Sequence, residues 1–336
     1  TTDNSHGSIS TTLVLTEAEQ TWVFTGITQS PVPSLLRGFS APVVLNYAFS
    51  DAELLTQLAH DTDAFNRWEA GQRLALPSEA YMAEQLDVVD PQRIHAVRES
   101  MRQQLADSLQ ADWAWAFETY GDTGAYRPDP VSTGQRALTG SALLMLCLAA
   151  RTSGDTVWPG KAYQRFKDAG NMTDRFNALS ALVHSGAELA KPALERFHAL
   201  FKSEPLVIDK WFALQAGTCD RGGNVLPAVK QLMKHPDFSL KNPNRARSLI
   251  FSYCSANPGA FHRTDAAGYV FWSDRVLELD AINPQVASRL ARGMDRWSKL
   301  AEPYRTAARE AIARVAAKPD LSNDVREIVS RALGDD

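Results

Sequence analysis

The chain has 336 residues, of which 44% are hydrophobic and 22% charged, and its formal net charge is −4. This composition is that of an ordinary globular protein, and it offers no basic surface for binding nucleic acid. No apolar run approaches the ~20 residues that a membrane-spanning helix needs. We therefore expect neither nucleic acid nor a membrane as a partner.

The first fifty residues have the composition of β-strands. Short segments rich in Val, Thr and aromatic residues lie at 11–15, 20–27 and 42–49, with prolines and glycines between them. Three short strands make a poor independent core. We therefore predict that residues 1–49 form part of a small β-sandwich domain.

At Ser50 the pattern changes to amphipathic helix. Ser50 and Glu53 fit a capping box, and leucines then recur at helical spacing. A second start is predicted at Pro77-Ser78. Later starts are predicted where an Asx residue precedes a proline, because the Asx side chain can accept from the first-turn N–H groups. These pairs are Asp90-Pro91, Asn242-Pro243, Asn257-Pro258 and Asn283-Pro284.

Further starts are predicted at single prolines: Pro192, Pro227, Pro303 and Pro319. Residues 121–135 are predicted to be a surface loop between two helices. Many short helices in series favour an α-solenoid. The fold class predicted is therefore mainly α, with residues 50–336 forming an all-helical superhelical domain.

The three cysteines, Cys147, Cys219 and Cys254, are odd in number and far apart in sequence. This argues against a disulfide framework and for a reducing compartment, so we expect a cytoplasmic protein. Buried, inert thiols are the interpretation favoured for all three.

The histidines do not form a recognisable metal motif. None of the seven lies in an H-E-x-x-H pattern, and His184 with Glu188 one turn later supplies only two potential ligands. An independent hydrolase that uses His184 or His262 would lack a nucleophile or metal spacing. We predict no catalytic residue, no metal ligand and no cofactor bound by this chain.

Polar clusters at predicted helix starts are the remaining candidates for function, and their plain interpretation is helix capping. Several of them, with other segments, make the chain resemble the C-terminal part of bacterial aminopeptidase N, a zinc metallo-aminopeptidase of the gluzincin type. The matches run in the family's order from about residue 12 to the end: LTEAEQTWVF (15–24), PVPSLLRGFSAPV (31–43), LPSE (76–79), GNMTD (170–174), DKWF (209–212), NPNRARSL (242–249) and NPQVASRL (283–290).

The resemblance implies that residues 1–49 are the later part of a β-sandwich domain and that the helical domain caps a catalytic domain. The helical domain would enclose a chamber for short peptides. The family's zinc motif and general base lie upstream of the matching region. Zinc would therefore belong to the full-length parent, and this chain would bind none and be inactive by itself, with the upstream catalytic domain as its partner.

The resemblance also implies substrate-binding residues. Arg247 in NPNRARSL and Arg289 in NPQVASRL match arginines that point into the family's chamber, and Gln285 is a weaker companion. A guanidinium offers a planar, charged fork to a peptide carboxylate. The alternative is that both arginines brace helix ends by pairing with carboxylates. Arg292 and Arg296 lie outside the motif and are expected on a solvated or packing face.

The sequence departs from the family at one junction. Helical sequence separates the family's counterparts of NRWEAGQRLA (66–75) and LPSE, but here the two segments are directly joined. Either this protein lacks a helical hairpin or the sequence omits a segment.

A second hypothesis is a free-standing α-solenoid scaffold that binds peptides or proteins and has no enzymatic activity. A concave face lined with Arg and Asn would serve that purpose as well.

Overall fold

The fold is taken from a computed structural model, which describes residues 11–28, 30–37, 47–63, 66, 76–121 and 126–334. The chain divides into two compact units, Thr1–Ala75 and Leu76–Asp336. Among the described residues, no helix combines the length and the apolar composition that crossing a membrane requires.

The described part of the first unit contains helix α1, Asp51–His60. Ser50 Oγ accepts from the Glu53 N–H at 3.3 Å, and the Glu53 carboxylate accepts from the Ser50 N–H at 2.8 Å. The predicted capping box is therefore confirmed.

The predicted strands are not formed in the described residues of the first unit. Residues 11–28 and 47–50 contain no strand, whereas 42–46 lie outside the described residues. Most side chains of 11–28 are exposed, as with Val23 at 82%. A strand needs a neighbour that takes up its backbone N–H and C=O groups and a second layer that buries its apolar face. The described residues supply neither, so the structure shows no strand in these ranges.

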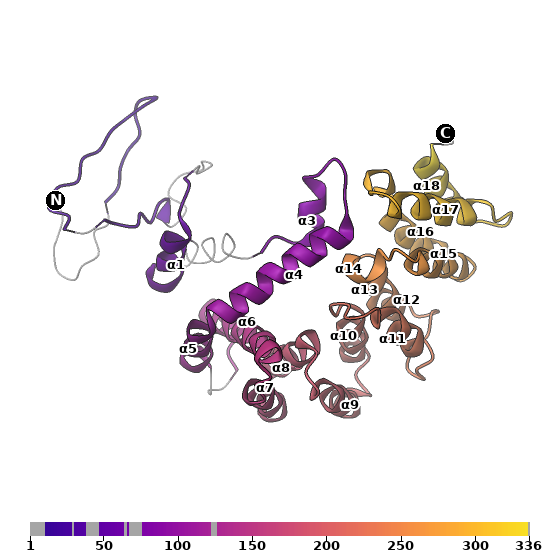
Figure 1. The fold of residues 1–336 in the computed structure, drawn as a ribbon, viewed down its shortest axis with the longest axis horizontal. Coiled ribbons are helices and arrows are strands. Elements are labelled where there is room, and N and C mark those ends of the chain that lie inside the picture. The colour runs from indigo at the N-terminus through magenta and orange to yellow at the C-terminus, as the bar shows by residue number, and fades with distance from the viewer. Residues whose placement is uncertain are drawn as a thin grey trace. The chain divides into compact units, whose positions relative to one another are not determined.

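The second unit is an array of helices in which helices close in sequence pack against each other (Figure 1). Its first part contains α3 (Glu79–Glu84), α4 (Pro91–Ser108), α5 (Gln110–Tyr120), α6 (Pro130–Ser153), α7 (Val157–Asp168), α8 (Met172–Ser185), α9 (Ala190–Phe201), α10 (Pro205–Ala216) and α11 (Val225–Leu232).

The second part of the array contains shorter helices and two irregular turns. Its elements are α12 (Pro243–Ala246), the π-helical turn η2 (Arg247–Phe251), α13 (Ser252–Cys254), α14 (Pro258–Phe261), α15 (Ala267–Asp280), α16 (Pro284–Ala291), the 3₁₀ turns η3 (Arg292–Met294) and η4 (Trp297–Lys299), α17 (Tyr304–Ala316) and α18 (Asn323–Leu333). The mainly helical fold class is confirmed.

Helix α4 connects early and late parts of the array. It packs on α3, α5 and α6, and also on α14 (Figure 1). Just before it, Val89 pairs with the segment around Leu300, because the Val89 N–H donates to Lys299 O at 2.7 Å and Val89 O accepts from Ala301 N–H at 2.8 Å. Gln92 Nε2 donates to the carbonyls of Gly259 and His262, each at 2.7 Å. These contacts fix the start of α4 on the later helices.

The core of the second unit is a continuous cluster of apolar side chains. Its buried members run from Val89 to Val329, and its largest are fully buried aromatic residues: Phe166, Phe197, Phe212, Tyr253, Phe261, Tyr269 and Trp272. The Trp272 indole N–H donates to Leu290 O at 3.0 Å, so its polar atom is satisfied inside the core. Helices from both parts of the array share this cluster.

Most of the predicted helix starts are confirmed. Ser78, Asp90, Asn242 and Asn283 each accept first-turn N–H groups, at the starts of α3, α4, α12 and α16. Helix α14 also begins at the predicted Asn257-Pro258 pair, but the Asn257 side chain makes no capping hydrogen bond. Its amide donates instead to the carbonyls of Ala216 and Thr218, at 2.8 and 2.7 Å.

A single proline predicts a helix start less reliably than an Asx-Pro pair does. Pro192 and Pro227 lie in the first turns of α9 and α11, and Pro303 is the N-cap of α17. Pro319 does not start a helix, since α18 begins at Asn323 with Ser322 as its cap.

The predicted loop over 121–135 is too long. Asp129 caps α6 by accepting from the Ser132 N–H, and α6 begins at Pro130. The sequence contains the Asx-Pro signal at Asp129-Pro130, so the end of this loop was predictable. The junction at 75/76 cannot be compared, because residues 67–75 lie outside the described residues.

Candidate functional site

A cleft of about 470 Å³ lies within the second unit. It is lined by α3 and α4 on one side and on the other by turns of the later helices around Cys219, Asn257 and Met294. None of the predicted site residues lines this cleft. The LPSE motif supplies Ser78 and Glu79 to its lining, but the sequence did not reveal the cleft, because its two sides come from distant parts of the chain.

His95 of α4 lies at the centre of a polar chain in the cleft. Its Nδ1 is 2.7 Å from Glu79 Oε1, and its Nε2 is 3.5 Å from Cys219 Sγ. Hydrogen bonds to the Cys219 sulfur and to the Glu79 carboxylate raise the pKa of His95 to about 10, against the opposing effect of burial. The imidazole is therefore protonated at neutral pH and can donate from both nitrogens.

A glycine makes room for the His95 ring. A Cβ atom on Gly259 would lie 2.4 Å from His95 Nδ1, closer than real Cβ contacts come. Residue 259 must therefore be glycine for the ring to lie where it does. Glu79, in the first turn of α3, contacts Nδ1 of the same ring.

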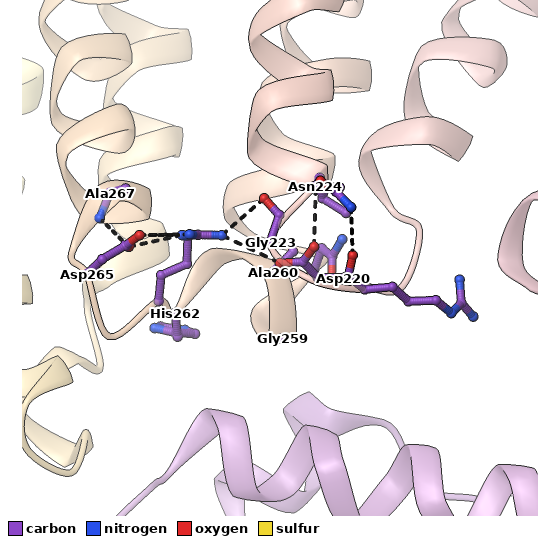
Figure 2. Close-up of polar contacts among 12 residues, drawn as sticks. Asp220, Gly223, Asn224, Gly259, Ala260, His262, Asp265 and Ala267 are labelled. Carbon is purple, nitrogen blue, oxygen red and sulfur yellow. Dashed lines mark hydrogen bonds and ion pairs between the residues drawn. The ribbon is translucent and has the colours of Figure 1, made fainter. Parts of the chain in front are cut away.

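The turn that carries Cys219 is held on two sides. Asn257 donates to the carbonyl of Thr218 directly before it. After it, Arg263 lies 3.7 Å from the Asp220 carboxylate and donates to Gly223 O at 3.4 Å. In Figure 2, Asp220 and Gly223 lie at one end of this group of contacts, and Asp265 and Ala267 at the other.

Arg263 is itself fixed by Asp265, because its Nε and Nη2 both donate to that carboxylate, with the shortest contact at 2.7 Å. This pairing raises the pKa of Arg263 and lowers that of Asp265. The expectation that all three thiols are buried is wrong for Cys219, which is partly exposed, whereas Cys147 and Cys254 are buried.

The two histidines considered for an independent hydrolase are neutral. Burial is the main cause that lowers the pKa of His184 to about 4, and burial alone does the same for His262. His262 Nδ1 is 2.8 Å from the Tyr269 hydroxyl. Tyr269 is fully buried, so its hydroxyl is out of reach of a substrate, and no side-chain hydrogen bond of His184 is found among the described contacts.

The predicted substrate-binding residues lie elsewhere on the second unit. Gln285 and Arg289 are exposed on α16, four residues apart, and Arg247 is exposed at the start of η2. Arg247 Nη1 donates to Asn244 Oδ1 at 3.2 Å. Within the described ranges neither arginine forms an ion pair, so the helix-bracing alternative finds no carboxylate partner there.

The other arginine of NPNRARSL behaves differently. Arg245 is buried and its Nη1 lies 2.9 Å from Asp209 Oδ1, so the ion pair joins this motif to the DKWF motif. Its guanidinium also lies over the Phe212 ring, 5.2 Å from the centroid. Arg245 is therefore a structural residue, which distinguishes it from the exposed Arg247.

Two groups of His and carboxylate side chains in the described residues gather potential ligand atoms within 4.8 Å: Glu79, His95 and Glu99, and His198, His235 and Asp237. A zinc-bound histidine must offer a free nitrogen lone pair. His95 is protonated on both nitrogens. His198 Nε2 bonds Asp237 at 2.6 Å, and His235 Nδ1 accepts from the Asp237 N–H. As arranged here, neither group fits zinc.

The chain matches two family models. Residues 1–48 match a domain of unknown function, DUF3458, described as having an Ig-like fold. Residues 51–76 and 73–334 match a domain of unknown function, DUF3458_C, described as ARM repeats. The Ig-like description covers the segment predicted to be part of a β-sandwich, and the two pieces of the second match join near residue 75.

Aminopeptidase N of Caulobacter vibrioides is 32% identical over 365 residues, which cover 96% of this chain and 42% of that protein. Aminopeptidase N of Escherichia coli is 32% identical over 371 residues, 97% of this chain and 42% of that protein. The crystal structure of Legionella pneumophila aminopeptidase A in complex with aspartic acid matches with a TM-score of 0.73 and 27% identity, covering 93% of this chain and 42% of that one.

The chain thus spans less than half the length of these relatives. The alignments are longer than the 336 residues of this chain, so the relatives carry positions that it lacks. The chain belongs to the DUF3458_C family of ARM-repeat domains and is homologous to the C-terminal part of bacterial aminopeptidase N.

Proposed function

We propose that this chain is the helical part of an aminopeptidase N, where it walls the chamber that receives short peptides. In this proposal Arg289, Arg247 and Gln285 contact the end of the peptide distal to the scissile bond. The observation that carries it is the state of Arg289, which lies exposed within a family motif and has no ion-pair or hydrogen-bond partner for its side chain among the described residues.

The chemistry of an exopeptidase explains the need for such a residue. An enzyme that holds the free amine of a short peptide leaves a carboxylate at the other end. A guanidinium that is not already paired can donate two parallel hydrogen bonds to that carboxylate. Gln285 lies one helical turn before Arg289, so its amide can reach the same ligand.

Arg247 is supported by its local structure. It begins the π-helical turn η2, which interrupts the helix between α12 and α13. Such π-turns occur often at functional sites. Its one hydrogen bond among the described contacts, to Asn244, leaves other guanidinium donors available for a ligand.

The chain's own residues bind and orient the peptide in this proposal, and they do not make or break its bonds. Zinc, when bound in the catalytic domain, would polarise the scissile carbonyl and activate a water molecule. The H-E-x-x-H motif is absent from this sequence, and the histidine groups described above do not fit the metal. We therefore assign the zinc chemistry to the catalytic domain that would pack against this one.

Arg289→Ala in the full-length aminopeptidase tests the proposal. We expect KM for di- and tripeptides to rise about tenfold with little change in kcat, since a contact made equally in the ground and transition states is lost. Arg292→Ala is the matched control, because Arg292 is also exposed but lies outside the motif. An unchanged KM in Arg289→Ala, or an equal rise in Arg292→Ala, would contradict the proposal.

A peptide-binding scaffold without hydrolysis is the second candidate, and the ARM-repeat description favours it. The chamber wall and the scaffold differ in how the effect of Arg289→Ala depends on peptide length. A chamber wall affects short peptides most, whereas an open concave surface binds long and short peptides through the same contacts. A scaffold would therefore lose affinity for peptides of every length in Arg289→Ala.

A further inference from the structure

The cleft contains a thiol, an imidazole and a carboxylate that are connected in series by short contacts. They belong to Cys219, His95 and Glu79. The Sγ–Nε2 distance is 3.5 Å and the Nδ1–Oε1 distance is 2.7 Å. A protonated imidazole next to a cysteine, held in place by a third group, is one arrangement that activates a nucleophile. The second Glu79 oxygen is buried and has no hydrogen-bond partner among the described residues, so the carboxylate acts mainly on His95.

Cys219 differs from the other two cysteines in its surroundings. Burial raises the pKa of Cys147 to about 12 and raises that of Cys254 as well, so both stay protonated. Cys219 is partly exposed, lies beside the protonated His95, and interacts electrostatically with Arg221. Cys219 is therefore the one of the three cysteines that an anionic reagent in the cleft can reach, next to cationic side chains.

The charges around the cleft favour an anionic reagent. The ionisable groups that line it or flank Cys219 are Glu79, His95, Arg98, Glu99, Arg102, His184, Asp220, Arg221, His262, Arg296 and Lys299. His184 and His262 are neutral, Glu99 is paired with Arg98 and Arg102, Asp220 with Arg263, and Arg296 with Glu84. The remaining cations, His95, Arg221 and Lys299, outnumber the single remaining carboxylate, Glu79.

We propose that Cys219 is a modification site that exchanges with small anionic disulfides entering this cleft. The Cys219 thiolate attacks one sulfur of the disulfide, a new bond forms between that sulfur and Cys219, and the original S–S bond breaks. The displaced sulfur leaves as a thiolate and takes a proton from the His95 imidazolium or from water. One disulfide replaces another, so no further oxidant is needed.

The test uses glutathione disulfide as an anionic probe and cystamine as a cationic one, on the full chain. The rate of mixed-disulfide formation is followed by mass spectrometry, with peptide mapping to assign the cysteine. The variants are His95→Ala and Glu79→Gln, and Cys219→Ser identifies the site. His198→Ala is the matched control, since it removes another histidine–carboxylate pair outside the cleft.

In the wild type, glutathione disulfide should modify Cys219 before Cys147 and Cys254, and faster than cystamine does. His95→Ala should slow the reaction at pH 7 about tenfold and make its rate rise with pH, because the thiolate loses its cationic partner. Glu79→Gln should slow it less, and His198→Ala should not change it. If His95→Ala is unfolded by circular dichroism, Glu79→Gln decides the test.

Equal rates in the wild type and in both folded cleft variants would overturn the proposal. Faster reaction with cystamine than with glutathione disulfide would overturn the preference for anionic disulfides. Modification of Cys147 or Cys254 ahead of Cys219 would show that reaction follows unfolding and not the cleft geometry, which would overturn the proposal as well.

Discussion

The histidines of the second unit are held in opposite charge states by their surroundings. Hydrogen bonds that His95 donates to Cys219 and Glu79 raise the pKa of His95 to about 10, whereas burial lowers the pKa of His184 and His262 to about 4. At neutral pH the first is charged and the other two are not. Both the charged and the neutral histidines therefore contribute to the pH dependence of the free energy of unfolding.

Lowering the pH should destabilise the protein through His184 and His262. Unfolded histidine titrates near 6.5, so the unfolded state binds more protons than the folded state between about pH 6.5 and 4. The stability that these residues contribute is present above pH 6.5 and is lost as pH falls through 4, by up to about 1.4 kcal/mol per pH unit and histidine. Urea unfolding at a series of pH values measures this.

His262→Gln should flatten that pH dependence, whereas substitution of the exposed His60 should not. His95 changes stability with pH in the opposite direction. Its contribution to the free energy of unfolding is fully present below about pH 6.5 and declines as pH rises towards 10. A free energy of unfolding that stays constant from pH 7 to 4.5 would show that the folded protein does not hold the two histidines in the neutral form.

The two arginines of NPNRARSL should differ in their effect on stability. Arg245→Ala leaves Asp209 as an unpaired charge in a largely buried place, which costs about 3–5 kcal/mol in comparable cases. Arg247→Ala should stay within about 0.5 kcal/mol, because its side chain is exposed. Chemical unfolding compares them. Equal losses would contradict the assignment of Arg245 to structure and of Arg247 to ligand contact.

Two Asn-Pro pairs that look alike in the sequence have different roles as structural elements. Asn283 caps α16 by accepting from the Val286 N–H, whereas the Asn257 amide is buried and holds the carbonyls of Ala216 and Thr218. Asn283→Ala should lower the free energy of unfolding by about 1 kcal/mol, the usual value of an N-cap. It should leave the disulfide exchange of Cys219 unchanged.

Asn257→Ala should change that exchange rate, since it frees the turn that positions Cys219 next to His95. Rate measurements with glutathione disulfide on both variants test this difference. The same rate in both variants would mean that Asn257 does not hold the turn.

Local signals in the sequence predicted the helical elements well because helix starts depend on neighbouring residues. Ser50 with Glu53, Asp90 and Asn283 have their partners within three positions along the chain. The cleft was not predictable in this way. His95 and Cys219 are 124 positions apart, and Asn257 bonds carbonyls about 40 positions away. Their proximity depends on how α4 packs on the later helices.

The structure shows no strand in the described part of residues 1–49, whereas the family model that matches residues 1–48 has an Ig-like fold. The Val- and Thr-rich segments of 11–28 have the local composition of strands, but strand formation depends on partners that the described residues do not supply. The site prediction stays open. The sequence motif singled out Arg289, and the structure shows it exposed and unpaired among the described residues, but no contact within this chain reports on a peptide.

The second unit should fold without the first. Its core cluster draws its buried residues from Val89 onward, within the described part of the chain. Residues 76–336 expressed alone should unfold in one cooperative thermal transition, with a midpoint within about 2 °C of that of the full chain. A broad transition or a much lower midpoint would show that residues 1–75 support the helical array.

The most direct test of the chamber proposal asks whether Arg289 contacts the carboxylate of the peptide. KM is measured in the full-length aminopeptidase for a tripeptide and for its C-terminal amide, with the wild type and with Arg289→Ala. Amidation removes the charge that the guanidinium would bind. We predict that amidation raises KM about tenfold in the wild type and has little effect in Arg289→Ala, since the two changes remove one interaction. Equal effects of amidation in both proteins would contradict the account.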